Sequence, residues 1–189
     1  MRVLITNDDG IDSEGLHTLA AVAVEQGHDV VVAAPSWDST SSGVNQGPNT
    51  GHAVLHSGTV GAAFTAATFG LPAMAVSLTV RDAPLWETAA AIVRVVLPWA
   101  TELEPPSVLN VNVPAVDVAE LRPLQVATLA PFGAVQTTIT ERGEGYLKLG
   151  YTEISAEADG DTDAGLLARG VPCYTILRAV CEVSAPAGR

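Results

Sequence analysis

The first 35 residues, MRVLITNDDGIDSEGLHTLAAVAVEQGHDVVVAAP, decide the fold class. Residues 1–7 and 29–34 are short apolar runs rich in β-branched side chains, which predict strands buried on both faces. Between them, residues 13–26 carry apolar side chains three and four positions apart, which predicts an amphipathic helix with Asp12 or Ser13 as its cap. Strand, helix and strand in this order predict a βαβ unit with parallel strands and a right-handed crossover.

The alternation of strands and helices continues to residue 114. The expected elements are a loop at 36–56, a helix at 57–69, a strand at 71–78, a helix at 85–97 that Pro98 ends, and a strand at 108–113. This alternation predicts an α/β sheet.

Beyond residue 114 the pattern becomes richer in strands. The expected elements are extended segments at 121–130, 146–154 and 174–183 and a short helix at 161–169. We therefore expect one domain over residues 1–189, with a core at 1–114 and a smaller β-rich extension at 115–189. An exposed hairpin at 146–154 would suit pairing with another subunit, and an ordinary edge of the same domain is an equal alternative.

Composition limits the function classes. The chain has 189 residues, 48% of them hydrophobic, and a formal net charge of -12. It is too apolar to be disordered, and it lacks the basic face that a non-specific nucleic-acid binder needs. No apolar run is long enough to span a bilayer, and the start has no secretory-signal pattern, so we expect a cytoplasmic protein that does not bind membranes.

The two cysteines, Cys173 and Cys181, lie eight residues apart in one expected strand. An extended segment would separate their Cα atoms by roughly 26 Å, and a disulfide needs about 4.4–6.8 Å. We expect reduced thiols.

Polar residues gather where the expected strands end, which is where open α/β sheets bind ligands. Asp8 and Asp9 follow the first strand, and Ser39 and Thr40 lie in the loop after the second. Adjacent carboxylates repel each other, and a bound cation relieves that repulsion. Asp-Asp-Gly is also turn chemistry, but its position at a strand end favours a metal site.

Two further segments carry candidate ligands. Asn45 and Asn49 lie in a glycine-bearing loop, where a solvated turn is the simpler explanation of either residue alone. Ser57, Gly58 and Thr59 open a helix, whose first N–H groups suit a phosphate, although Ser57 could be a plain helix cap.

Several common motifs are absent. The chain has no G-x-x-x-x-G-K-[ST], no G-x-G-x-x-G after the first strand and no G-x-S-x-G. These absences weigh against P-loop, dinucleotide-binding and α/β-hydrolase functions.

Three motifs together resemble the SurE family. They are MRVLITNDDGI at 1–11, SGVNQGPN at 42–49 and SGTVGAA at 57–63. Later segments that resemble the family are PAMAVSL at 72–78, WETA at 86–89, LNVNVP at 109–114 and DTD at 161–163. The resemblance implies a Rossmann-like, mostly parallel sheet with helices on both faces, and a metal-dependent nucleotidase that removes phosphate from nucleoside 5′-monophosphates, with 3′-monophosphates as a second candidate class.

The resemblance also implies roles for individual residues. Asp8 and Asp9 would be catalytic. The implied metal ligands are Asp8, Asp9, Asn45 and a hydroxyl from Ser39 or Thr40, and the implied phosphate ligands are Asn49, Ser57, Gly58 and Thr59. One Mg²⁺ or Mn²⁺ ion and a homodimer or homotetramer would complete the enzyme.

One departure from the family pattern lies between the second-strand loop and the Ser42–Asn45 motif. The family has several dozen residues there, including the strand that leads into the motif, whereas here Ser42 follows Thr40 almost at once. Either the segment has been lost or the sequence as written omits it, and the intact motifs on both sides favour omission.

Two other functions remain open. A haloacid-dehalogenase-type aspartyl phosphatase uses two aspartates separated by one residue, and Asp8 and Asp9 are adjacent. A nucleotide-binding or assembly module with a degenerate site would bind ligand without releasing phosphate.

Overall fold

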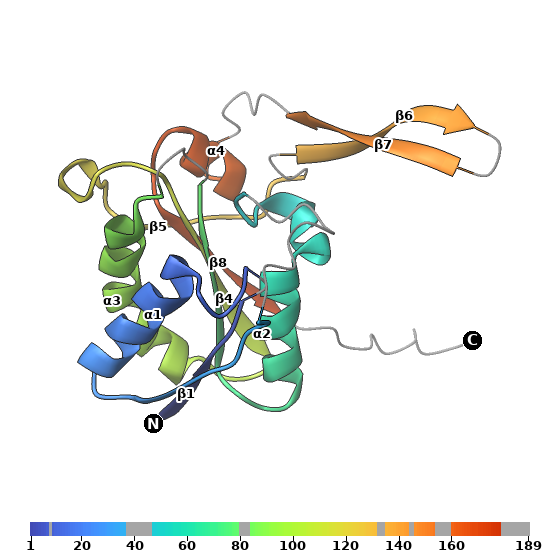
Figure 1. Ribbon diagram of the computed structural model, residues 1–189. Coiled ribbons are helices and arrows are strands. Elements are labelled where there is room, and N and C mark those ends of the chain that lie inside the picture. The colour runs from blue at the N-terminus through green and yellow to red at the C-terminus, as the bar shows by residue number, and fades with distance from the viewer. Residues whose placement is uncertain are drawn as a thin grey trace, which may run out of the picture.

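Three groups of strands make up the sheet structure of this computed structural model, which describes residues 1–7, 9–36, 47–79, 84–131, 135–143, 146–153 and 160–178 (Figure 1). The first pairs β1 (Arg2–Ile5) with β2 (Asp29–Val32). The second has the order β3 (Ala73–Leu78), β4 (Ser107–Val113), β8 (Cys173–Arg178) and β5 (Gln125–Val126). The third is the hairpin of β6 (Val135–Gly143) and β7 (Tyr146–Glu153). The pairs β1–β2, β3–β4 and β5–β8 are parallel, which confirms the expected α/β class.

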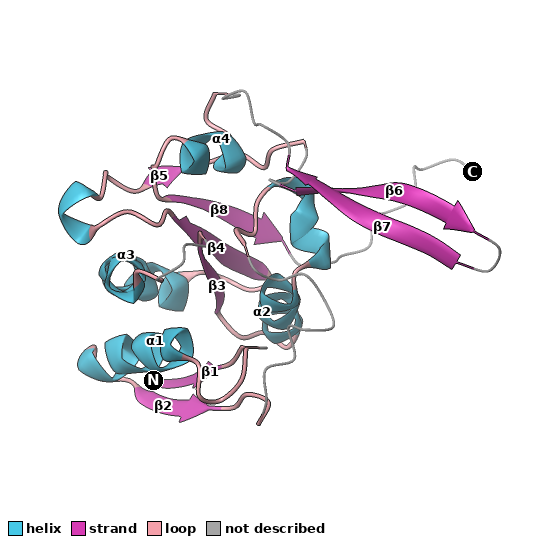
Figure 2. Ribbon diagram, turned by 45° about the horizontal axis from the view of Figure 1, so that its top comes forward, coloured by secondary structure: helices cyan, strands magenta, loops and turns pink. Residues whose placement is uncertain are grey.

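Helices cover both faces of β3 and β4 in the four-stranded sheet. They are α1 (Glu14–Glu25), α2 (Gly58–Thr68), α3 (Trp86–Glu102) and the short α4 (Asp163–Ala168), with 3₁₀ turns η2 (Gly51–His56) and η3 (Val118–Glu120). In Figure 2, α1 and α3 lie together on one side of the strands and α2 lies on the other. The chain therefore has the three-layer arrangement of a doubly wound fold.

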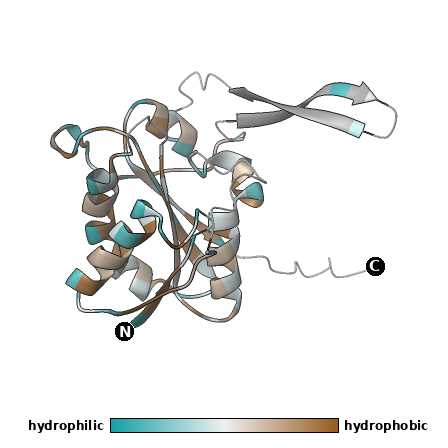
Figure 3. Cartoon of the chain, in the orientation of Figure 1, coloured by the Kyte–Doolittle hydropathy of each residue, from teal (hydrophilic) through white to brown (hydrophobic). Residues whose placement is uncertain are grey.

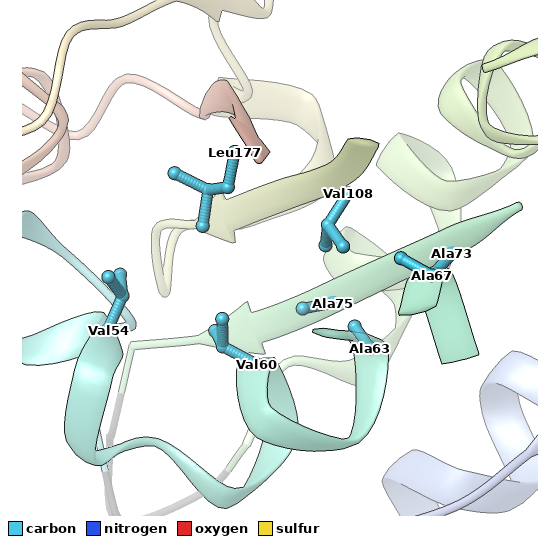
Figure 4. Packing of buried hydrophobic residues seen from close by; sticks show 8 residues of the cluster. All are labelled: Val54, Val60, Ala63, Ala67, Ala73, Ala75, Val108 and Leu177. Atoms are coloured by element: carbon cyan, nitrogen blue, oxygen red, sulfur yellow. The ribbon is translucent and has the colours of Figure 1, made fainter. Parts of the chain in front are cut away.

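The sides of β3 face different helix layers. Ala73 and Ala75 pack with Val60 and Ala63 of α2, as Figure 4 shows. The alternate residue Val76 packs towards α1 and α3. Small residues on one side of the strand thus let α2 approach closely. Figure 3 shows that hydrophobic residues concentrate on the strands between the helix layers.

Helix α3 is longer than the sequence indicated. We expected Pro98 to end it, and this is wrong, because the helix continues through Pro98 to Glu102. A proline has no N–H for the carbonyl four residues earlier. That carbonyl belongs to Arg94, and it accepts a hydrogen bond of 2.8 Å from Gln26 Nε2 at the end of α1. The neighbouring helix therefore replaces the missing bond.

The first strands are less buried than expected. We predicted burial on both faces, but Leu4 is 64% exposed and Val31 is 43% exposed. By contrast, Val108 and Val111 of β4 are fully buried. The prediction fails because, in the part of the chain that the structure describes, no helix covers the outer face of β1 and β2 (Figure 2).

The second half of the chain differs from its predicted pattern in three places. Strand β8 lies between β4 and β5, so part of the expected extension belongs to the main sheet. The hairpin spans β6 and β7 rather than lying within 146–154. Only residues 125–126 of the expected segment 121–130 form a strand. None of the described helices has the length and apolar character to cross a membrane.

Two serines occupy equivalent helix-start positions with different contacts. Ser57 caps α2, with its Oγ accepting from Val60 N at 3.1 Å. Ser13 precedes α1 and makes no side-chain cap bond. We predict that Ser57→Ala lowers the free energy of unfolding by about 1 kcal/mol, whereas Ser13→Ala changes it by less than about 0.5 kcal/mol. Urea denaturation followed by circular dichroism measures both, and equal losses would contradict the assignment of the cap.

Candidate functional site

A cavity of about 650 Å³ lies between β1 and β3. Its walls include all of residues 1–7, and Asn7, Asp9, Gly58 and Thr59 contribute polar groups to it. The cavity thus joins the end of β1 to the beginning of α2.

These polar groups lie where both strands end. The evidence is that α1 and α3, which follow β1 and β3 in the chain, run side by side in the same direction. At their beginnings, Trp86 Nε1 donates to Glu14 Oε2 at 3.0 Å. Further along, Arg94 forms a 3.1 Å ion pair with Glu25. Each helix follows its strand, so β1 and β3 end at the same edge, the edge where α/β sheets bind ligands.

The end of β1 presents an amide and a carboxylate. Asn7 Oδ1 and Nδ2 are both buried, and neither has a hydrogen-bond partner in the described part of the chain. Asp9 is exposed. The loop that carries them is fixed to the end of β2 by the 2.8 Å bond from Ile11 N to Pro35 O. A buried amide without partners is costly, so a polar ligand at this edge would stabilise it.

The beginning of α2 presents main-chain donors. Ser57 Oγ and Ser57 O accept from Val60 N and Gly61 N. Helix geometry leaves the N–H groups of Gly58 and Thr59 without an intrahelical acceptor, and both residues line the cavity. Together with the helix dipole, these N–H groups favour an anionic ligand.

A network of buried side chains holds Asn49. Its N–H donates to Asn112 Oδ1 at 2.8 Å, and its carbonyl accepts from Asn110 Nδ2 and Asn112 Nδ2, both at 2.9 Å. Asn49 Nδ2 also donates to Ser77 Oγ. One N–H of the Asn49 side chain is therefore engaged with the protein rather than with a ligand.

A buried carboxylate fixes the same loop from the other side. Asp163 is fully buried and accepts from Gly51 N at 2.8 Å, Ala130 N at 2.9 Å and Ala164 N at 2.8 Å. Three main-chain donors satisfy the charge of this carboxylate. It joins the loop before η2 to the beginning of α4 and to the segment after β5.

Cys173 lies beside this carboxylate and is a free thiol. Burial, and to a smaller extent the nearby charge of Asp163, raises the pKa of Cys173 to about 12. Its Sγ donates a weak bond of 3.6 Å to the carbonyl of Asp163. The thiol therefore stays protonated at neutral pH, which is typical of a packing residue rather than a nucleophile.

The sequence-predicted site residues divide into two groups. Four of the expected metal ligands, Asp8, Ser39, Thr40 and Asn45, lie outside the described residues, as does Cys181. The described ones are Asp9, Asn49, Ser57, Gly58 and Thr59, and of these Asp9, Gly58 and Thr59 line the cavity. Within the described ranges, no three His, Cys, Asp or Glu side chains are grouped to hold a metal ion.

Sequence reasoning missed the residues that support the site. Asn110, Asn112, Ser77 and Asp163 were not named as functional candidates, although each is buried and polar. A signal was present, because Asn110 and Asn112 alternate in an otherwise apolar strand. Polar residues on one face of a buried strand require partners, which indicates a buried network.

Comparison with known proteins gives consistent matches. The sequence model of a family described as "Survival protein SurE" matches residues 3–41 and 38–133. A protein of Legionella pneumophila (strain Paris), named 5′-nucleotidase SurE, is 35% identical over 160 residues, covering 82% of this chain and 60% of the relative. A relative of the same name from Synechococcus sp. (strain JA-3-3Ab) is 29% identical over 237 residues, covering 94% and 92% of the two chains.

A solved structure also has this fold. The crystal structure of a SurE protein from Aquifex aeolicus superposes with a TM-score of 0.77 at 21% identity. It covers 94% of this chain and 93% of the other. At this identity the likeness concerns the fold alone.

Removal of the Asp163 carboxylate should destabilise the segments that it joins beside the candidate site. We predict that Asp163→Ala lowers the free energy of unfolding by about 3 kcal/mol or more, because three buried N–H groups lose their acceptor. Asp163→Asn keeps one acceptor oxygen and should have an intermediate effect. Asp161→Ala, an exposed neighbour, is the control and should stay within about 0.5 kcal/mol. Denaturant unfolding measures all three, and a loss at Asp163 as small as the control's would contradict the anchoring role.

Proposed function

Because the chain belongs to the SurE family, we propose that it is a metal-dependent nucleotidase that releases phosphate from nucleoside 5′-monophosphates. One observation carries the proposal: a single cavity is lined by Asn7 and Asp9 at the end of β1 and by Gly58 and Thr59 at the beginning of α2. An acidic group and a helix N-terminus on one cavity suit a cation and a phosphate as neighbours. Nucleoside 3′-monophosphates are a second substrate class to compare.

The donor chemistry of this edge fits a divalent metal ion. Asp9 offers a carboxylate and Asn7 a buried amide oxygen, and both are hard oxygen donors. We expect Asp8, Asp9, Asn45 and a hydroxyl of Ser39 or Thr40 to hold one Mg²⁺ or Mn²⁺. When bound, such an ion supplies Lewis-acid polarisation of the phosphoryl group and lowers the pKa of water.

The protein's own groups bind and orient the phosphate. The N–H groups of Gly58 and Thr59 would donate to its non-bridging oxygens, where charge is concentrated in the transition state. Asn49 is a further predicted phosphate ligand, through a polar group that Ser77 does not use. The chain has a net charge of -12, so an anionic substrate needs this local positive potential to enter.

Asp8 is the residue that we expect to accept a proton from the attacking water. It directly precedes Asp9 in the sequence, and Asp9 lines the same cavity as Gly58 and Thr59. Water attack without a covalent enzyme intermediate distinguishes this mechanism from that of an aspartyl phosphatase.

The oligomeric state and the cellular location of the protein are predictions. The hairpin of β6 and β7 projects from the body of the molecule in both views (Figures 1 and 2), which supports its use in a homodimer or homotetramer. Between the two strands of the hairpin, Tyr146 Oη donates to Glu141 Oε1 at 2.7 Å. We expect the nucleoside monophosphate to be the small-molecule partner and the cytoplasm to be the location.

Asp8→Asn tests the acidic pair. We predict at least about a hundredfold less phosphate released from AMP, because the variant loses a metal ligand and a base. Asp12→Asn lies in the same loop and should retain activity. Phosphate release is measured with circular dichroism as a check of folding, and full turnover by a folded Asp8→Asn would refute the metal-site argument.

Metal removal is an independent test. We predict that dialysis against EDTA abolishes phosphate release, and that Mg²⁺ or Mn²⁺ restores it, without a change in the circular dichroism spectrum. Colorimetric phosphate release before and after metal addition measures the effect. Activity that persists after exhaustive chelation, or a trapped aspartyl-phosphate, would favour a different mechanism.

A further inference from the structure

Strands β1 and β3 lie on two sides of one cavity and do not pair. In the described part of the chain, β1 pairs only with β2 and β3 pairs only with β4. We call the cavity between them, lined by residues 1–7 and by Met74, Val76 and Leu78, the strand slot. A parallel sheet is thus interrupted in its middle.

The main chain of β1 points polar groups into the strand slot. The carbonyls of Met1 and Ile5 accept from Asp29 N in β2 and from Ala33 N directly after it, so the odd residues of β1 bond towards β2. In a parallel ladder, the N–H and C=O of one residue point to the same side. The N–H and C=O groups of Arg2, Leu4 and Thr6 therefore point to the opposite edge, into the strand slot.

The same reasoning applies to β3. Thr79 N donates to Val113 O at 2.9 Å, so the odd residues of β3 bond towards β4. Met74, Val76 and Leu78 then direct their main-chain groups away from β4, and these three residues line the strand slot. The two strand edges that face each other therefore carry main-chain N–H and C=O groups without a neighbouring strand. An apolar small molecule in the strand slot would leave these groups unpaired.

The dimensions match one strand. Neighbouring strands lie about 4.8 Å apart, the layer is about 10 Å thick and each residue rises about 3.3 Å, which gives roughly 160 Å³ per residue. The cavity of about 650 Å³ therefore holds about four residues. This is the length of β1, which has 4 residues.

The lining is apolar on both faces. Leu19 and Val93, from α1 and α3, line one side, and Ala62 and Ala66 of α2 line the other. A segment in the strand slot would contact helices on both faces, as a central strand of a parallel sheet does. Its side chains must therefore be apolar on both faces.

The comparisons indicate a source for such a segment. The family's sequence model matches in two stretches that meet at residues 38–41. The alignment with the Synechococcus relative runs over 237 positions, although it covers only about 178 residues of this 189-residue chain. In total, the relative has about 59 aligned residues without a counterpart here, and a strand and a helix together need fewer.

We propose that the strand slot binds an extended apolar peptide segment as a strand between β1 and β3. The segment's chemistry is that of the stretch which the longer relatives carry and this chain lacks. For the 189-residue chain, the segment arrives as a separate polypeptide and is held by main-chain hydrogen bonds to both edges. This inference does not depend on the proposed phosphatase activity.

The test uses the unmatched stretch of the Synechococcus relative, fused to a small soluble carrier, as the probe. We expect saturable binding to the 189-residue chain by fluorescence anisotropy, and none of the carrier alone. Hydrogen exchange followed by NMR should slow at the amides of Leu4 and Val76. The amides of Val30 and Val32, which point away from β1 on the outer edge of β2, should exchange as before.

Two proline variants form a matched pair. Leu4→Pro removes a donor that faces the strand slot, and Val32→Pro removes one that faces outward. We expect Leu4→Pro to weaken probe binding about tenfold and Val32→Pro to leave it unchanged, with circular dichroism confirming that both fold.

Several outcomes would overturn the proposal. They are equal binding by the two variants, absence of exchange protection at Leu4 and Val76, and failure of the probe to bind. Self-association of the chain that blocks the probe would show that a second copy fills the strand slot, which also contradicts the proposal. Because none of these readouts uses phosphate release, a failure here is distinct from failure of the nucleotidase assignment.

Discussion

The position of the candidate site depends on how two asparagines of β4 hold the main chain of Asn49. Asn110 and Asn112 donate to its carbonyl, and Asn112 also accepts from its N–H. Buried amides in a sheet interior are costly unless they are paired, so this arrangement is strongly specified. Asp163 also accepts from Gly51 N, so the first residue of η2 is held in a fixed position. The position of the beginning of α2 follows from this, and with it the N–H groups of Gly58 and Thr59 that we propose to bind phosphate.

The other half of the site is positioned in a different way. Asp9 follows β1, and in the described part of the chain β1 has no ladder to the main sheet. Its placement relies on helix packing, through Trp86 against Glu14 and Arg94 against Glu25. Gly15 allows this contact, because a Cβ there would lie 2.6 Å from the Trp86 ring. Exposed ion pairs contribute little, so the contact between α1 and α3 depends mainly on apolar burial.

The sequence predicted those features that follow from local pattern. The βαβ unit, the cap Ser57 and most strand positions needed only periodicity and short-range hydrogen bonding. The length of α3 could not be predicted, since the bond from Gln26 to the carbonyl of Arg94 joins distant parts of the chain. The exposure of Leu4 was hidden for a related reason: an apolar strand predicts burial, but only the whole fold shows whether a covering layer exists.

The candidate site and the strand slot share one cavity, so their occupants would affect each other. A strand that runs parallel to β1 and β3 ends at the edge where Asn7, Asp9 and Thr59 meet. Ligand-binding residues in α/β proteins lie just beyond such ends. The residues after the bound strand would then lie beside the groups proposed to hold metal and phosphate, at the edge that carries the buried amide of Asn7. In the described part of the chain, the unpaired edges of β1 and β3 and the amide of Asn7 thus all lie on this one cavity.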